Sequence, residues 1–158
     1  MKKVWTKWDI ILLCLFLLTA CGSGKEATPW TMEDAEAILN SGAFSDELEE
    51  LDLDTAFALY GLAGGGLDRT ALTDGVVHYS SGATCEELAL LIFQDQETAQ
   101  SAEQPLKDYL QSQLEANQDY RPGEIPKLNS ALLKRRENVW LLVVAADAPT
   151  AMDAAGLQ

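Results

Sequence analysis

Hydrophobic residues at helical spacing predict two amphipathic helices. After Thr31, apolar residues recur with this spacing until Gly42, and they are Met32, Ala35, Ile38 and Leu39. Thr31 and Asp34 have the spacing of a capping box, so we expect the first helix to begin directly after Thr31. A longer helix is predicted over residues 96–117, where one face carries Ala99, Ala102, Leu106, Leu110 and Leu114. Pro105 should kink this helix or mark a restart.

Two other segments have the pattern of β-strands. Residues 75–82 alternate apolar and polar side chains, which is typical of a strand with one buried face. Residues 87–93, ELALLIF, form a continuous apolar run, which is typical of a strand buried on both faces. Thr84 and Glu87 also have the spacing of a capping box, which would begin a helix here instead. We favour the strand.

Shorter elements are predicted on either side of these strands. Residues 44–53 have the apolar pattern of an extended segment, and a short helix follows from about Thr55 to Tyr60. Asp54 is expected to cap this helix and Gly61 to end it. A loose loop is expected next, at Gly64, Gly65 and Gly66.

The C-terminal part of the chain predicts a turn, a hairpin and a closing helix. YRPGEIP has turn-forming composition, the apolar runs at 131–135 and 139–145 flank three polar residues, and a short helix is expected from about Thr150. Together these elements favour a single α+β domain over residues 31–158. We expect a mainly antiparallel sheet of about four to five strands, covered by one long helix and short helices.

The first twenty residues have the pattern of a secretory signal peptide. Lys2, Lys3 and Lys7 precede an uncharged apolar run at residues 10–18. A retained membrane helix is the rival interpretation, but it needs about 20 apolar residues, roughly twice the length of this run. Export followed by cleavage is therefore favoured.

The residues before Cys21 are an apolar residue followed by two small ones, Leu18, Thr19 and Ala20. This order resembles the lipobox of bacterial lipoproteins, in which a diacylglyceryl group is added to the cysteine and the signal is cut before it. The resemblance implies a lipoprotein signal at 1–20, a lipidated cysteine with a flexible tether at 21–30, and anchoring at the extracytoplasmic face of the cell membrane. Two or more acyl chains hold a protein durably on a membrane. The alternative is an ordinary secreted protein with a chance cysteine at its cleavage site.

Charge restricts the partners of the mature chain. The full sequence has a formal net charge of −14, which becomes −16 without the signal because three lysines and one aspartate leave with it. Such a chain is expected to be repelled by anionic lipid headgroups and by nucleic acid, whose phosphates require basic patches. The lipid, rather than the overall charge, is expected to hold it on the membrane.

Cysteine and histidine content excludes several kinds of site. With Cys21 lipidated, Cys85 is the one thiol left in the mature chain, so no internal disulfide can form. A single histidine, His78, accompanies it, which excludes zinc sites of clustered Cys and His ligands. No cofactor is expected, and Cys85 is interpreted as a small buried hydrophobe with no cation nearby to lower its pKa.

A family resemblance covers the region from about Phe44 to Asp147. Its features are the sequence YGL at residues 60–62, YSSGATCEELALLIF, the long helix, and YRPGEIPKL followed by the hairpin. On these features the chain resembles the domain of unknown function 4358 family of bacterial lipoproteins. The resemblance implies a cell-envelope lipoprotein and brings no catalytic signature or established activity.

Three groups of residues are weighed as chemical sites. His78 with Ser80 or Ser81 suggests a small hydrolase, although no GxSxG elbow surrounds either serine. The acidic residues of 46–54 suggest a calcium-responsive module, although the alternating leucines explain them as the wet face of a strand. GLAGGGLDRT lacks the lysine and hydroxyl residue of a phosphate-binding loop.

The basic residues Lys134, Arg135 and Arg136 form the remaining candidate site, a weak partner-binding surface. They are positioned to face the membrane or an acidic partner, or simply to keep a hairpin turn soluble. We therefore expect a membrane-anchored, non-catalytic domain that binds or scaffolds another envelope component, with the hydrolase and the calcium-responsive module as alternatives.

Overall fold

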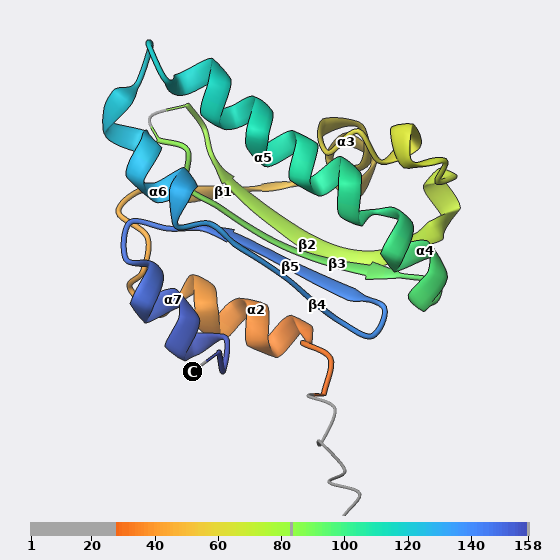
Figure 1. The fold of residues 1–158 in the computed structure, drawn as a ribbon. Helices are drawn as coiled ribbons and strands as arrows, with labels where there is room; N and C mark the ends of the chain where they lie inside the picture. The colour runs from red at the N-terminus through yellow and green to blue at the C-terminus, as the bar shows by residue number, and fades with distance from the viewer. Residues whose placement is uncertain (1–27, 83, 158) are drawn as a thin grey trace, which may run out of the picture.

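The computed structural model describes residues 28–82 and 84–157, in which five antiparallel strands form one sheet (Figure 1). The strands lie in the order β1-β2-β3-β5-β4. Their bounds are Leu48–Leu51 for β1, Leu72–Ser80 for β2, Glu87–Phe93 for β3, Leu132–Arg136 for β4 and Val139–Val144 for β5. The expected α+β fold with a mainly antiparallel sheet of about four to five strands is confirmed.

Six α-helices and three short 3-10 helices accompany the sheet in the described residues. The α-helices are α2 (Met32–Leu39), α3 (Leu53–Leu59), α4 (Gln96–Ser101), α5 (Glu103–Asn117), α6 (Ile125–Asn129) and α7 (Ala148–Ala154). The 3-10 helices are η1 (Leu62–Gly65), η2 (Arg69–Ala71) and η3 (Pro122–Glu124).

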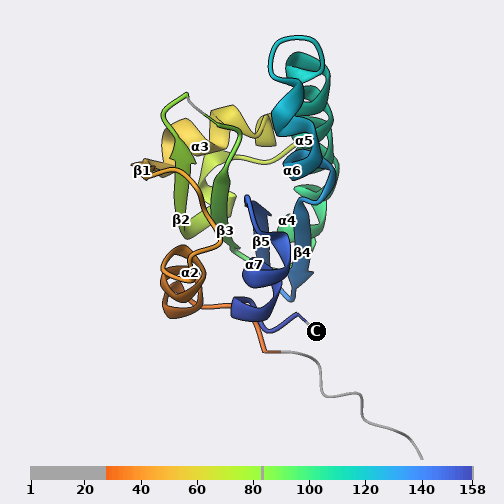
Figure 2. The same cartoon turned by 90° about the vertical axis from the view of Figure 1, so that its left-hand side faces the viewer.

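Helices cover both faces of the sheet, as Figure 2 shows. On one face, Ala89 and Leu91 of β3 pack in a core with Leu106 of α5 and with residues of α3, α4 and α6. On the other face, Leu88 of β3 packs in a second core with Ile38 of α2 and with residues of α7. Successive residues of a strand point to opposite faces, so β3 and β5 contribute to both cores. This explains why ELALLIF is apolar without alternation, as expected for a strand buried on both sides.

The long helix over residues 96–117 is interrupted. Ala102 separates α4 from α5, and Pro105 is the third residue of α5. A proline is tolerated in the first turn of a helix because its missing N–H would have no partner there. The restart that Pro105 predicts is therefore confirmed. The capping box of α2, formed by Thr31 and Asp34, is also confirmed.

Several predicted boundaries were wrong. Asp52 rather than Asp54 caps α3, because β1 ends one residue earlier and the Asp52 carboxylate accepts from the N–H of Thr55. β2 begins at Leu72 rather than at residue 75, and the expected loop at Gly64 and Gly65 forms η1 instead.

The turn expected in YRPGEIP is a 3-10 turn, η3, that leads directly into the short helix α6. The predicted hairpin is present as β4 and β5. Glu137 lies in its turn with a φ of 52°, a left-handed conformation.

Candidate functional site

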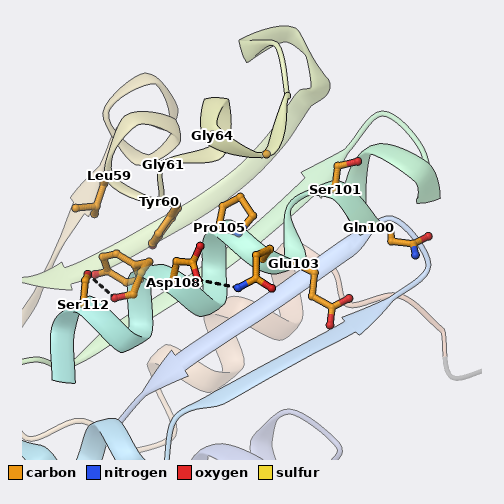
Figure 3. Close-up of a pocket in the computed structure, with 13 residues that line it drawn as sticks. Leu59, Tyr60, Gly61, Gly64, Gln100, Ser101, Glu103, Pro105, Asp108 and Ser112 are labelled. Atoms are coloured by element: carbon orange, nitrogen blue, oxygen red, sulfur yellow. Dashed lines mark hydrogen bonds between the residues drawn. The ribbon is translucent and has the colours of Figure 1, made fainter. Parts of the chain in front are cut away.

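A cleft of about 660 Å³ lies along the first turns of α5, between that helix and the segment that joins α3 to η1 (Figure 3). Leu59 and Gly64 line one side of it, and Gln104, Asp108 and Ser112 of α5 line the other. The carboxylates of Glu103 and Asp108 line the cleft, and none of the described lining residues is Lys or Arg, but Glu103 pairs with Lys107 over 2.6 Å beside it. The cleft is therefore acidic at its rim and partly apolar inside.

Gly65 brings the two walls together. A Cβ atom at this position would lie 2.6 Å from the carbonyl oxygen of Ser101 and 2.9 Å from Cγ of Pro105. Because only glycine permits this approach, η1 packs directly on the α4–α5 junction. Gly64, one residue earlier, has open space around its Cα, and Gly61 begins the segment with a φ of 62°. The glycines expected to form a loose loop therefore shape one wall of the cleft.

A buried carboxyl group lies behind the wall. Glu87, the first residue of β3, is 3% exposed and accepts hydrogen bonds from the hydroxyl groups of Tyr60 and Tyr109. The Tyr109 bond is 2.8 Å long, and the two rings meet edge to face with centroids 4.9 Å apart. Both tyrosines also line the cleft, so their hydroxyl groups bind Glu87 while the residues face the ligand space.

The environment of Glu87 changes its acidity. Burial raises the pKa of the Glu87 carboxyl from 4.5 to about 7, although the hydrogen bonds from Tyr60 and Tyr109 lower it in part. No salt bridge reaches Glu87 from any residue that the structure describes. Burial, followed by the charge of Glu87, raises the pKa of both tyrosine hydroxyls, which therefore stay protonated as donors. The result is a carboxyl group that changes charge near neutral pH beside a cleft.

A smaller hollow of about 180 Å³ lies on the other side of Tyr109. Cys85, Glu87 and Arg121 line it, and Nη1 of Arg121 donates to the carbonyl oxygens of Gly82 and Thr84 over 3.0 and 3.3 Å. Burial raises the pKa of the Cys85 thiol, and the nearby positive charge of Arg121 opposes this effect. The expectation that no cation lies near Cys85 was therefore wrong. The thiol is half-buried rather than fully buried.

The neighbouring Glu86 has a structural role. Its side chain is fully buried and accepts from Nζ of Lys127 over 2.7 Å, and from the hydroxyl and the backbone N–H of Ser45. Burial raises the pKa of Glu86, but the hydrogen bonds from Lys127 and Ser45 outweigh it and hold the pKa below its ordinary value. The ion pair joins α6 to the residue before β3, and the hydrogen bonds from Ser45 join Glu86 to the segment before β1.

The pair proposed for hydrolysis is not assembled in the described residues. His78 and Ser80 lie two positions apart on β2, but the Ser80 hydroxyl donates to Asp46 over 2.6 Å and accepts from the N–H of Thr84. Nδ1 of His78 is buried and has no hydrogen-bond partner within the described ranges. Ser81 is exposed in the bend after β2.

Three of the acidic residues of 46–54 have separate structural partners. Asp46 accepts from Ser80, Asp52 caps α3, and Asp54 pairs with Arg69 over 2.6 Å. Across residues 28–82 and 84–157, no group of three or more His, Cys, Asp and Glu side chains is arranged to hold a metal ion.

The basic residues lie at the end of β4. Lys134 and Arg135 are exposed, whereas the Arg136 guanidinium lies 3.9 Å from the ring centroid of Trp30. Arg136 also donates to the carbonyl oxygen of Thr28 over 3.3 Å. Arg136 is thus close to the point where the chain enters the domain, whereas Nη1 of Arg135 donates to the carbonyl oxygen of Glu137 over 2.8 Å.

Glu87, Tyr60 and Tyr109 are not recognisable as a site from local sequence pattern. One signal was available, because Glu87 is the first residue of the run assigned to a strand buried on both faces. A carboxyl group in such a strand is buried whichever face it points to, and charged side chains are rarely buried without a hydrogen-bond or ion-pair partner.

The residues of the lipobox, Leu18, Thr19 and Ala20, and the lipidation site Cys21 lie outside the described residues. In the part of the chain that the structure covers, no helix combines the length and the apolar character needed to cross a bilayer. Comparisons of the chain with protein-family models, with curated proteins and with solved structures return no match.

Proposed function

We propose that this protein is a bacterial lipoprotein, held by acyl chains on Cys21 at the extracytoplasmic face of the cell membrane, and that its domain binds a ligand or partner in the cleft along α5. The proposed domain is non-catalytic. We also propose that the chain belongs to the domain of unknown function 4358 family, for which the resemblance implies no established activity.

The cleft itself is the observation that carries the binding function. Its volume of about 660 Å³ is that of ordinary ligand sites. Its walls are fixed before any ligand arrives, because Gly65 packs on the α4–α5 junction and Tyr60 and Tyr109 are both hydrogen-bonded to Glu87. A rigid site loses less conformational entropy when it binds.

The lining favours a neutral or cationic ligand. Glu103 and Asp108 bring carboxylates to the rim, and the chain as a whole carries a net charge of −14. Leu59, which is 41% exposed, and the partly exposed Tyr109 supply apolar contact area, and Gln104 and Ser112 supply donors and acceptors. An anionic ligand would meet repulsion from Asp108, which forms no salt bridge within the described residues, whereas Lys107 offsets the charge of Glu103.

The anchor is tested by metabolic labelling with an alkyne-bearing fatty acid in a bacterial host. The wild-type protein should carry the label, Cys21→Ala should lose it, and Cys14→Ala should keep it because Cys14 lies in the cleaved signal. Label on the Cys21→Ala variant, or none on the wild type, would contradict the anchor.

The binding site is tested by photocrosslinking in cells. A photoreactive amino acid is placed at Leu59 or Gln104, which line the cleft, and at Glu36, an exposed position on α2, as the control. We expect one recurrent species from both cleft positions and not from Glu36. Mass spectrometry then identifies it.

A blocking variant makes this test specific. Gly64→Trp places a large side chain in the cleft at a position where an added Cβ meets no atom within 4 Å, so the fold should tolerate it. Crosslinking from Gln104 should disappear in this variant while its melting temperature stays close to that of the wild type. Equal capture from Glu36, or capture that survives Gly64→Trp, would remove the cleft as the binding site.

A further inference from the structure

The two carboxylates that line the cleft differ in whether their charge is offset. The hydrogen bond from Lys107, and the charges of Lys107 and Arg135, hold the pKa of Glu103 below its ordinary value. Asp108 forms no salt bridge in the part of the chain that the structure describes. Nε2 of Gln104 donates to Oδ1 of Asp108 over 2.7 Å, which orients the carboxylate without neutralising it. The cleft therefore carries one uncompensated negative charge, that of Asp108.

This charge lies toward the end of the cleft where a second carboxyl group is buried. Figure 3 shows Asp108 and Ser112 toward the same end of the cleft as Tyr60, and Glu103 toward the other end. The Tyr60 hydroxyl group donates to Glu87, which lies behind the wall. Asp108 and Glu87 therefore both make this end of the cleft electrostatically negative when they are ionised.

Glu87 has no positive partner within the described ranges. Its carboxyl group accepts from two neutral hydroxyl groups, those of Tyr60 and Tyr109, and no salt bridge reaches it. Arg121 lines the hollow on the other side of Tyr109, but its guanidinium donates to two backbone carbonyl oxygens and to the side-chain oxygen of Asn117. A buried charge without a countercharge is costly. A cation in the cleft would offset part of this cost.

Apolar surface adjoins the negative end. Leu59 lines the cleft and is 41% exposed, although it is a large hydrophobic residue. Gly61 and Gly64 follow it along the same wall and present no side chain, so an added chain meets no obstruction there. An alkyl chain that covers Leu59 would remove apolar area from water. The cleft thus places an apolar contact next to an uncompensated negative charge.

We propose that the cleft binds a small organic cation, with its ammonium or guanidinium group beside Asp108, its apolar chain against Leu59, and Glu87 as the second negative charge behind the tyrosines. This inference rests on the proposed function, in which the cleft is the binding site. A partly enclosed, concave site of this volume suits a small molecule. The attraction between opposite charges is stronger there than in open water, because the effective dielectric constant is lower.

Three probes of equal chain length and different charge test the proposal: hexylammonium, hexanol and hexanoate. The mature chain is labelled at its leucine methyl groups and titrated with each probe by NMR. The methyl signals of Leu59 report on the cleft, and those of Leu39, which packs in the core on the other face of the sheet, are the reference. At pH 8 the amine is protonated and Glu87 is largely ionised, because its pKa is about 7.

We expect hexylammonium to shift the Leu59 signals with a dissociation constant of about 1 mM. Hexanol should bind about tenfold more weakly, because it gains the same apolar contact without the charge interaction. Hexanoate should not bind, and no probe should shift the Leu39 signals.

A matched pair of variants on α5 isolates the charge of Asp108. Asp108 and Glu115 are both exposed, and each accepts from a glutamine one turn earlier, Gln104 over 2.7 Å and Gln111 over 2.8 Å. Asp108→Asn should weaken the binding of hexylammonium about tenfold and leave that of hexanol unchanged. Glu115→Gln removes the same charge from the same helix outside the cleft lining, and should leave both affinities unchanged.

Glu87→Gln tests the buried charge. At pH 8 this variant should weaken the binding of hexylammonium about threefold and leave that of hexanol unchanged. A merely structural effect on the walls of the cleft would weaken both probes equally. An unchanged affinity for hexylammonium, or an equal loss for both probes, would overturn the part assigned to Glu87.

The remaining outcomes separate the ligand class from the cleft itself. Equal affinities for hexylammonium and hexanol, or tighter binding of hexanoate, would overturn the cationic ligand and keep the cleft as a binding site. A failure of all three probes to shift the Leu59 signals would contradict the cleft, and with it the proposed function.

Discussion

The hydroxyl group of Tyr109 donates a 2.8 Å hydrogen bond to Oε2 of Glu87, a carboxyl group that is almost completely buried behind the cleft. Tyr60 donates to the other oxygen of the same carboxyl group. Neither tyrosine can neutralise a carboxylate, so the ionised form of Glu87 is buried without a countercharge. Burial of an unpaired charge opposes folding, and this cost is expected to depend on pH.

Glu87→Gln should stabilise the protein at pH 8 and have little effect in acid. The pKa of Glu87 rises from 4.5 to about 7 on folding. The stability that the protonated carboxyl group contributes to the folded state is therefore fully present below pH 4.5. It is lost as the pH rises through about 7 and the buried group ionises. Urea unfolding should show a gain for the variant of about 1 kcal/mol at pH 5 and about 3 kcal/mol at pH 8.

Glu86→Gln is the matched control, because Glu86 is also buried but is paired. The pKa of Glu86 lies below its ordinary value of 4.5. The stability contributed by its ionised form is therefore present above pH 4.5 and is lost only as the pH falls through the lowered pKa. The variant should be less stable than the wild type at both pH 5 and pH 8. A pH-independent effect of Glu87→Gln would contradict the ionisation assigned to Glu87.

Lys127→Met should destabilise the protein far more than Lys107→Met. Nζ of Lys127 lies 2.7 Å from the fully buried carboxylate of Glu86 and 3.1 Å from Glu124, whereas Lys107 pairs with the exposed Glu103 one helical turn away. Removing one partner of a buried pair costs about 3 kcal/mol, and an exposed pair of this type contributes about 0.5 kcal/mol. Denaturant unfolding at neutral pH measures both values, and comparable losses in the two variants would contradict the distinction.

The sequence predicted those parts of the fold that depend on local pattern. The capping box at Thr31, the strand of residues 87–93 and the hairpin are each encoded by neighbouring residues, and all three are present. The cap of α3 was assigned to the wrong aspartate because Asp52 and Asp54 are both suitable caps. The choice between them depends on where β1 ends, which is set by its pairing with β2.

The candidate site could not be predicted from local sequence pattern either, because its residues are far apart in the sequence. Glu87 lies 27 residues from Tyr60 and 22 residues from Tyr109, and these residues meet only because α3 and α5 pack on the same face of the sheet. The cleft depends on the close approach of Gly65 to Ser101 and Pro105, which follows from the packing of η1. Strand order and helix packing decide such contacts, and neither is encoded by spacing within one segment.

Gly65→Ala should destabilise the domain, and Gly64→Ala should not. The added Cβ at residue 65 meets the Ser101 carbonyl oxygen at 2.6 Å, whereas the one at residue 64 meets no atom within 4 Å. Forcing η1 away from α5 should cost about 2 kcal/mol, a typical value for an overpacked contact. Thermal unfolding of the two variants checks this, and equal melting temperatures would show that η1 can move without loss of stability.

Tyr109→Phe should raise the pH at which stability is lost. The variant keeps the ring that packs edge to face on Tyr60 but removes the hydroxyl group that donates to Glu87. This hydrogen bond lowers the pKa of Glu87, so without it the pKa should rise above about 7. Isotope-edited infrared spectroscopy of the carboxyl group should show the shift directly, together with a loss of about 1 kcal/mol in unfolding free energy. Tyr120→Phe, at a tyrosine that is 83% exposed, should change neither quantity. An unchanged Glu87 titration in Tyr109→Phe would mean that burial alone sets the acidity of the carboxyl group, and that the tyrosine hydroxyl contributes only to packing.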